Sequence, residues 1–135
     1  MGVDSTHKIG EDFYLVATAS GAVRPMSKLL RLSEYRGPAE RVLFDRSELK
    51  KILALYADRV ARGEWRDYAI DHRPNMAAFA VFRSSYEWPA FVIAKFSGTN
   101  ARQGNYVVSS GPRKLIQGRS IDEVLAVFER AVRPV

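Results

Sequence analysis

The spacing of apolar positions predicts a first helix between Asp45 and Gly63. Apolar residues recur there three and four positions apart, which places them along one stripe of a helix. Asp45 and Glu48 form the capping-box pattern at the start of the helix, and Gly63 is placed to take the left-handed conformation that ends one. The predicted stripe consists of Leu49, Ile52, Leu53, Tyr56 and Val60.

The stretch after Gly63 changes to patterns that are typical of strands. Residues 66–72 alternate between two faces, and two near-continuous apolar runs follow, separated by turn residues. A short strand over residues 40–44 is predicted before the first helix. The strands predicted after Gly63 cover residues 66–72, 76–83, 90–97, 106–109 and 114–117.

A second amphipathic helix closes the predicted domain. Residues 120–123 repeat the capping-box pattern, and Pro134 is placed to stop the helix. Its apolar stripe consists of Ile121, Val124, Leu125, Phe128 and Val132. Because consecutive strands joined by short turns pair antiparallel, the chain is predicted to have an α+β fold. We expect an antiparallel meander sheet of four to five strands with the two amphipathic helices on one face.

Both faces of this predicted sheet carry apolar side chains. Phe79 and Ile93 belong to one face, whereas Phe82 and Val92 belong to the other. An antiparallel sheet with a solvated face has one polar side, so we predict that the second face is covered. The cover is either residues 13–35 or a second copy of the chain. Turn residues at 37–38 separate an N-terminal arm, residues 1–38, from a single domain over 39–135.

The composition of the chain restricts its possible chemistry more than it restricts its possible fold. The chain has 135 residues, 47% of them hydrophobic, and no cysteine, which excludes disulfides, a thiolate nucleophile and cysteine-based zinc sites. No apolar run approaches the roughly 20 residues that span a bilayer. The four apolar residues at 13–16 follow two acidic residues and are too few for a secretory signal. We therefore expect a cytoplasmic protein, without a membrane association.

The net charge of +6 arises within one stretch of the chain. Residues 73–119 contain seven basic residues and one acidic residue, Glu87, whereas the charges elsewhere cancel. Tyr86, Trp88 and Tyr106 lie in the same stretch, and basic and aromatic side chains together are suited to phosphates and bases. The alternative interpretation is a solubilising surface. The candidate anion or nucleic-acid contacts are Arg83, Lys95, Arg102, Arg113, Lys114 and Arg119.

The order of helix, strands and helix is also similar to that of double-stranded-RNA-binding domains. Those domains carry a lysine-rich cluster at the start of the last helix, where this chain has residues 121–123, Ile-Asp-Glu. Two carboxylates at that place would repel phosphates. Nucleic-acid binding therefore remains the alternative rather than the preferred interpretation.

Few residues of the chain are of a type and spacing that could form a catalytic site. Asp67 and Asp71 share a strand face about 13 Å apart, which is too far for paired carboxylates, and His72 points to the opposite face. We interpret these acids as a solvated edge beside Arg66 and Arg73. The loop over 98–104 lacks the glycine spacing and lysine of a phosphate-binding loop. No catalytic, cofactor-binding or metal-binding residue is assigned, and we expect no cofactor.

A specific run of residues resembles a known family. Residues 42–49, Tyr56 and residues 63–71 are similar to small, uncharacterised alphaproteobacterial proteins grouped as a domain of unknown function. The resemblance extends over about residues 29–132, whereas residues 1–28 and the loop at 97–99 depart from it. It implies a bacterial cytoplasmic protein and supplies no reaction, ligand or partner. Its motif residues, of unknown role, are Trp65, Arg66, Asp67, Tyr68 and Asp71.

Three functions follow as hypotheses. The preferred one is a non-catalytic binding or protein-interaction module, which either self-associates or docks a protein partner. The alternative is binding of a nucleic acid or another polyanion through residues 73–119. The third is an enzyme whose site combines Asp67, Asp71, His72 and a basic residue.

Overall fold

The computed structural model describes residues 6–8, 14–20, 23–26, 42–84, 88–98 and 105–130. Within them, five antiparallel strands form one sheet in chain order, as a meander, and a smaller three-stranded sheet precedes it. The five strands are β4 (Asp67–His72), β5 (Met76–Phe82), β6 (Phe91–Phe96), β7 (Tyr106–Ser110) and β8 (Arg113–Gly118). The smaller sheet comprises β1 (Thr6–Lys8), β2 (Tyr14–Ala17) and β3 (Val23–Met26).

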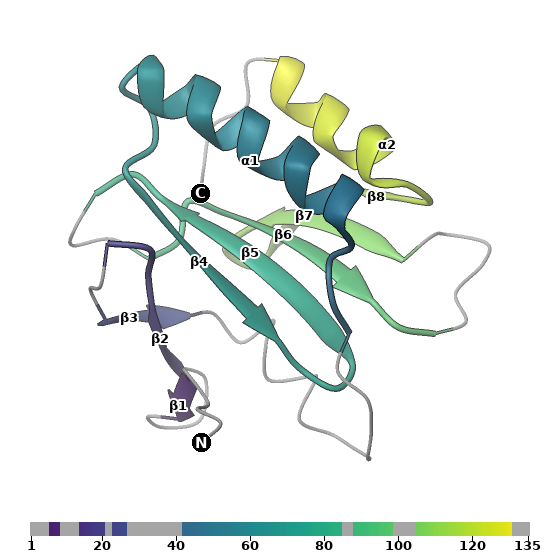
Figure 1. The fold of residues 1–135 in the computed structure, drawn as a ribbon, viewed down its shortest axis with the longest axis horizontal. Coiled ribbons are helices and arrows are strands. Elements are labelled where there is room, and N and C mark those ends of the chain that lie inside the picture. Colours follow the sequence, from purple (N-terminus) through teal and green to yellow (C-terminus); the bar gives the residue numbers. More distant parts are fainter. Residues whose placement is uncertain are drawn as a thin grey trace.

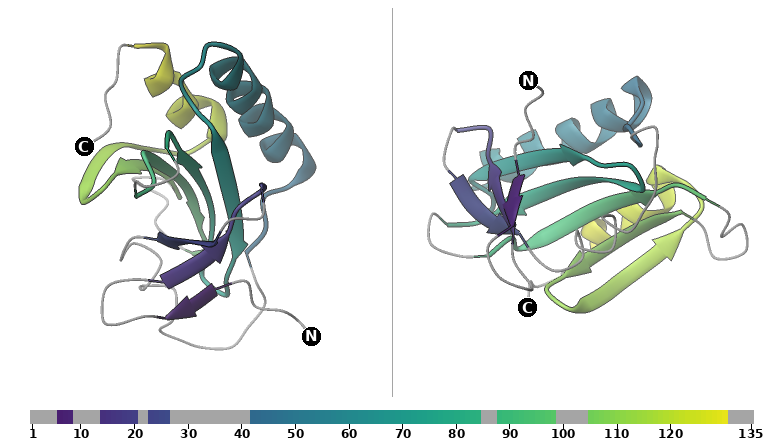
Figure 2. Two further views of the ribbon diagram at one scale, coloured as in Figure 1. Left: turned by 90° about the vertical axis from the view of Figure 1, so that its left-hand side faces the viewer. Right: turned by 90° about the horizontal axis from the view of Figure 1, so that it is seen from below.

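Two helical segments lie on one face of the five-stranded sheet, and the smaller sheet lies away from them (Figure 1; Figure 2). The first is helix α1 (Arg46–Ala61), and the second consists of α2 (Ile121–Leu125) and the 3₁₀ turn η2 (Ala126–Glu129). The predicted α+β fold, with an antiparallel meander and two helices on one face, is therefore confirmed. No helix in the described ranges is both long and apolar enough to cross a membrane.

Helix α1 begins and ends where the sequence predicts. The Asp45 carboxylate accepts from the Glu48 backbone N–H, and the Glu48 carboxylate accepts from the Asp45 N–H, so the capping box is complete. Gly63 has φ +78°, the left-handed conformation that favours glycine. The predicted stripe is wrong at Val60, which is 41% exposed, whereas its other members pack in or against the core.

Two other predicted elements differ in the structure. The strand predicted over residues 40–44 is absent from its described part, residues 42–44, where the Val42 backbone N–H donates to the Arg73 carbonyl and the Leu43 carbonyl accepts from the Lys95 ammonium. Residues 40–41 lie outside the described residues. The second helix tightens into η2 after Leu125, which buries Val127 together with Phe128. Its predicted end at Val132 and Pro134 lies outside the described residues.

The sheet separates two apolar cores. The larger core lies between the sheet and the helices and includes Ile52, Phe79 and Phe128. The second core lies on the opposite face and includes Met76 and Phe82, both fully buried. The prediction that both faces are covered is confirmed, and this burial occurs within a single copy of the chain.

Candidate functional site

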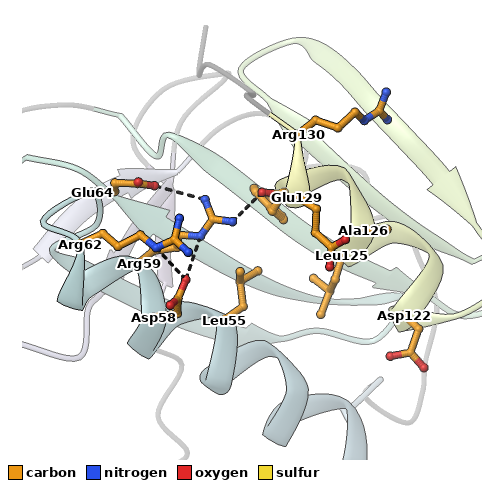
Figure 3. Close-up of a pocket in the computed structure, with 11 residues that line it drawn as sticks. Leu55, Asp58, Arg59, Arg62, Glu64, Asp122, Leu125, Ala126, Glu129 and Arg130 are labelled. Carbon is orange, nitrogen blue, oxygen red and sulfur yellow. Dashed lines mark hydrogen bonds and ion pairs between the residues drawn. The ribbon is translucent and has the colours of Figure 1, made fainter.

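A groove runs between helix α1 and the C-terminal helical segment (Figure 3). Its volume is about 1050 Å³. Leu55 on one side and Leu125 on the other supply apolar surface, and charged side chains surround them. We call this feature the groove; its lining residues are Leu55, Asp58, Arg59, Arg62, Glu64, Asp122, Leu125, Ala126, Phe128, Glu129 and Arg130.

Arg59 holds the two walls of the groove together at one end. Its guanidinium donates to the Phe128 carbonyl at 2.5 Å and to the Glu64 carboxylate at 3.2 Å, and Nε lies 3.4 Å from the Asp58 carboxylate. Only 15% of the Arg59 side chain is exposed. Arg59 therefore spans from α1 to η2 and fixes the width of the groove rather than extending into solvent.

The groove carries charges of both signs. Its lining includes three arginines and four carboxylates. At the end opposite Arg59, Lys51 and Asp122 form an ion pair of 2.8 Å between α1 and α2. Glu129 and Arg130 are exposed, and within the described part of the chain their side chains make no hydrogen bond or ion pair. These two groups remain available to a molecule that enters the groove.

Trp65 and Tyr68, two of the motif residues, belong to the core beneath the groove. Trp65 is 4% exposed, and its ring lies 5.5 Å from that of Phe128 in an edge-to-face contact. Tyr68 stacks on Phe79, with ring centroids 4.8 Å apart. Trp65 is therefore part of the core, whereas Trp88 is 45% exposed.

Asp67 fixes a turn of the N-terminal sheet to strand β4. Its carboxylate accepts from the Thr18 hydroxyl at 2.6 Å, from the Ser20 hydroxyl and from the Ser20 backbone N–H at 3.0 Å. Burial by itself raises the pKa of Asp67, but the hydrogen bonds from Ser20 and Thr18 outweigh it and hold the pKa below its ordinary value. Asp67 therefore acts as an ionised anchor.

The predicted solvated edge is wrong. Asp67 and Asp71 are 3% and 5% exposed, because the first binds residues 18–20 and the second pairs with Arg73 at 2.8 Å. His72 points to the other face, where its ring lies 6.1 Å from that of Phe44. The structure thus does not bring the two carboxylates and the imidazole together, and Arg66 is exposed beside them.

Lys95, a predicted anion contact, is bound internally. Its ammonium donates to the Glu48 carboxylate at 2.7 Å and to the Leu43 carbonyl at 2.9 Å. The Tyr106 hydroxyl donates to the same carboxylate. Burial raises the pKa of Glu48, and the bonds from Lys95 and Tyr106 more than reverse this effect. The cluster of Glu48, Lys95 and Tyr106 fixes the start of α1 to strands β6 and β7.

The meander divides the remaining basic candidates between opposite ends of the sheet. Arg83 follows the end of β5, and Arg113 and Lys114 begin β8, so these exposed residues share one end. Arg119 follows the end of β8 and therefore lies at the opposite end. Arg102 lies outside the described residues. Within those residues, no group of three His, Asp or Glu side chains is arranged to hold a metal ion.

Sequence reasoning did not identify the groove. Leu55 and Arg59 both lie off the stripe of α1 that predicts burial. The available signal was Leu55 itself, an apolar residue on the supposedly polar face, paired with Leu125 on the last helix. The groove is lined by residues of α1 and of the C-terminal helical segment, so it depends on packing between segments that are distant in the chain.

The described residues define a two-layer α+β domain, a five-stranded antiparallel meander with two helical segments on one face. The chain belongs to the family described as a protein of unknown function, DUF2794, whose model matches residues 42–132. The predicted resemblance to a domain of unknown function is therefore confirmed. Neither a curated protein nor a solved structure matches the chain.

Proposed function

We propose that this domain is a non-catalytic protein-interaction module, and that the groove receives a segment of its protein partner. The observation that carries the proposal is the combination of Leu55 and Leu125 with unpaired Glu129 and Arg130 in a groove of about 1050 Å³. Apolar surface surrounded by separate charges is the usual composition of a peptide-binding groove.

The charges of the groove indicate the chemistry of the partner. Glu129 suits a cationic side chain and Arg130 an anionic one, while an apolar side chain would contact Leu55 and Leu125. The four carboxylates of the groove are balanced by its three guanidiniums and by the Lys51 ammonium paired with Asp122, so the groove offers a polyanion such as a nucleic acid no net attraction. The partner segment is therefore an amphipathic peptide, with apolar residues on one side and charges of both signs beside them.

Selection from a random peptide library displayed on phage tests this proposal. We expect enriched peptides that combine an apolar anchor with acidic and basic residues, and NMR shift changes upon binding that centre on Leu55 and Leu125. Ala126→Arg places a long side chain in the groove and should abolish binding. Ala57→Arg is the matched control, because Ala57 is an exposed residue of α1 that does not line the groove. Peptides that bind both variants equally would contradict the proposal.

A second candidate is a polyanion site at one end of the sheet. Arg66, Arg83, Arg113 and Lys114 are exposed at this end, close in topology to exposed Trp88. The expected behaviour is binding of single-stranded DNA or RNA that weakens at least about tenfold between ~50 and ~200 mM salt. Arg83→Glu should remove this binding, and Arg119→Glu, at the opposite end, should preserve it. Absence of any binding at low salt would exclude this candidate.

The cellular location of the protein forms part of the same proposal. We infer a bacterial, cytoplasmic protein without membrane association, supported by the family resemblance and by the acidic pair that precedes the apolar residues 13–16. Fractionation of cells that express the chain at its natural level tests this inference.

A further inference from the structure

Leu43, just before helix α1, presents an apolar side chain to solvent. Its exposure of 57% is the highest among the large hydrophobic residues of the described chain. Its backbone is nevertheless fixed from two sides. The preceding N–H, that of Val42, donates to the Arg73 carbonyl at 2.8 Å. The Leu43 carbonyl itself accepts from the Lys95 ammonium at 2.9 Å. Because this backbone is already ordered, covering the side chain costs little further conformational entropy.

Charges of both signs accompany this apolar side chain. Asp45 and Arg46 follow Leu43 by two and three residues, and both are exposed. Asp45 uses Oδ1 to accept from the Glu48 backbone N–H. The Arg46 side chain makes no hydrogen bond or ion pair with any residue that the structure describes. The start of α1 therefore has the composition that the groove requires of its partner, an apolar side chain with an acid and a base beside it.

We propose that the groove of one copy of the chain receives Leu43 of a second copy. We call Leu43 the anchor. It contacts Leu55 and Leu125, the apolar surface of the groove. Both sides of this contact lie within residues 42–132, the region that matches the family. The inference rests on the proposed function, because it uses the same groove and names the protein partner as the chain itself.

The charges beside the anchor match those of the groove in sign and in spacing. Arg46 meets Glu129, and Asp45 meets Arg130. Asp45 and Arg46 lie at most about 7–10 Å along the chain from the anchor. Glu129 and Arg130 follow Leu125 by four and five residues, roughly 8–10 Å at the rise of a 3₁₀ turn. Neither Arg46 nor Glu129 has an ion pair among the described residues of its own copy, so their pairing breaks no existing one.

The first experiment removes one side of the contact at a time. Sedimentation velocity measures self-association of the full chain up to about 1 mM, since an interface built on one apolar side chain is small and weak. Leu43→Gln and Ala126→Arg should each weaken self-association about tenfold or more. Val60→Gln is the matched control and should leave it unchanged, because Val60 is also an exposed apolar residue but does not line the groove.

Mixing the two variants tests whether the anchor and the groove bind each other. The Leu43→Gln chain keeps its groove and the Ala126→Arg chain keeps its anchor, so one contact can form between them. We expect a heterodimer in the mixture although neither variant associates alone. In NMR, the labelled Leu43→Gln chain should show shift changes centred on Leu55 and Leu125. A mixture that stays monomeric would overturn the proposal.

Reversing the charges tests the pairing of Arg46 with Glu129 and does not depend on the folding of Ala126→Arg. Arg46→Glu and Glu129→Arg should each weaken self-association, and the double variant should restore it. Arg46→Glu is compatible with the fold, because an acidic residue in the first turn of a helix is favourable. Lys114→Glu is the matched control, since it changes the charge equally at an exposed residue of β8. Additive weakening in the double variant would overturn the pairing.

Peptide binding distinguishes this inference from the proposed function. A wild-type chain that stays monomeric up to about 1 mM, yet binds selected peptides in the groove, would overturn the inference and leave the interaction module in place. Selected peptides that bind Ala126→Arg as well as the wild type would contradict the proposed function itself. Self-association that persists in both Leu43→Gln and Ala126→Arg would show that copies associate through another surface, and would overturn the inference.

Discussion

The cluster of Glu48, Lys95 and Tyr106 provides a quantitative test of how α1 is held on the sheet. Glu48 lies in the first turn of α1 and is 7% exposed. Its carboxylate accepts from the Lys95 ammonium, from the Tyr106 hydroxyl and from the Asp45 backbone N–H. The perturbation is Glu48→Ala, which removes all three interactions and leaves Lys95 without its counter-charge.

The expected cost follows from the burial of the pair. Breaking a buried ion pair by removing one partner costs roughly 3–5 kcal/mol. Lys95 keeps 22% of its side chain exposed, so water relieves part of this cost, and we expect about 3 kcal/mol of lost stability. Tyr106→Phe removes one hydrogen bond to a charged group and should cost about 2 kcal/mol. In the Glu48→Ala background this bond is already absent, so the double variant should also cost about 3 kcal/mol.

Urea unfolding followed by tryptophan fluorescence measures these differences, because Trp65 is buried in the folded chain. The double-mutant cycle should give a coupling energy of about 2 kcal/mol between Glu48 and Tyr106. Lys114→Met is the control; Lys114 is exposed and its ammonium donates to the Gln117 side chain, so its removal should change stability by less than about 0.5 kcal/mol. This reasoning would be refuted if the costs of Glu48→Ala and Tyr106→Phe added in the double variant, or if Glu48→Ala cost less than about 1 kcal/mol. Lys95 would then again be a candidate anion contact.

Three further predictions concern the core, one turn and acid stability. Trp65→Ala should cost about 3–5 kcal/mol in urea unfolding, and Trp88→Ala less than about 1, because only Trp65 is buried. Gly63→Ala should cost about 1–2 kcal/mol, because φ is +78° there, and Ala61→Gly, in regular helix, should cost about 1 or less. The pKa values of Asp67 and Glu48 are lowered by folding, so both stabilise the fold above their unfolded pKa of about 4 and lose this contribution as the pH falls. Asp67→Asn should therefore flatten the decline of stability below about pH 4, and an unchanged decline would contradict the assignment.

The elements were predictable where the determinants are local. The capping box of Asp45 and Glu48 lies within four residues, and the turn at Gly63 needs only one residue with the right conformational freedom. The meander was also predictable, because short connections between apolar strands permit few other topologies. The exposure of Val60 and the tightening of the last helix into η2, which buries Val127, were not predictable, because both depend on packing between distant segments.

The roles of the charged residues could not be predicted, because their partners are distant in the chain. Asp67 and Asp71 were predicted to be solvated, yet Asp67 binds Thr18, which lies 49 positions away. Lys95 was predicted to contact an anion, yet its counter-charge is Glu48, 47 positions away. A charge count by segment therefore overstates the potential of residues 73–119, since Arg73 and Lys95 are both neutralised by buried carboxylates.

The neutralised charges also weaken the case for a polyanion partner relative to a protein partner. Of the basic residues that suggested a nucleic-acid surface, Lys95 is paired internally, and Arg119 lies at the other end of the sheet from Arg83 and Arg113. Among the described residues, only Arg66, Arg83, Arg113 and Lys114 then share one end of the sheet, whereas affinity for nucleic acids grows with the number of phosphates contacted together. The groove needs no such convergence, because an apolar contact with one or two charges beside it is enough to hold a peptide. The arrangement of charge within the fold, rather than its total of +6, therefore favours a protein-interaction module.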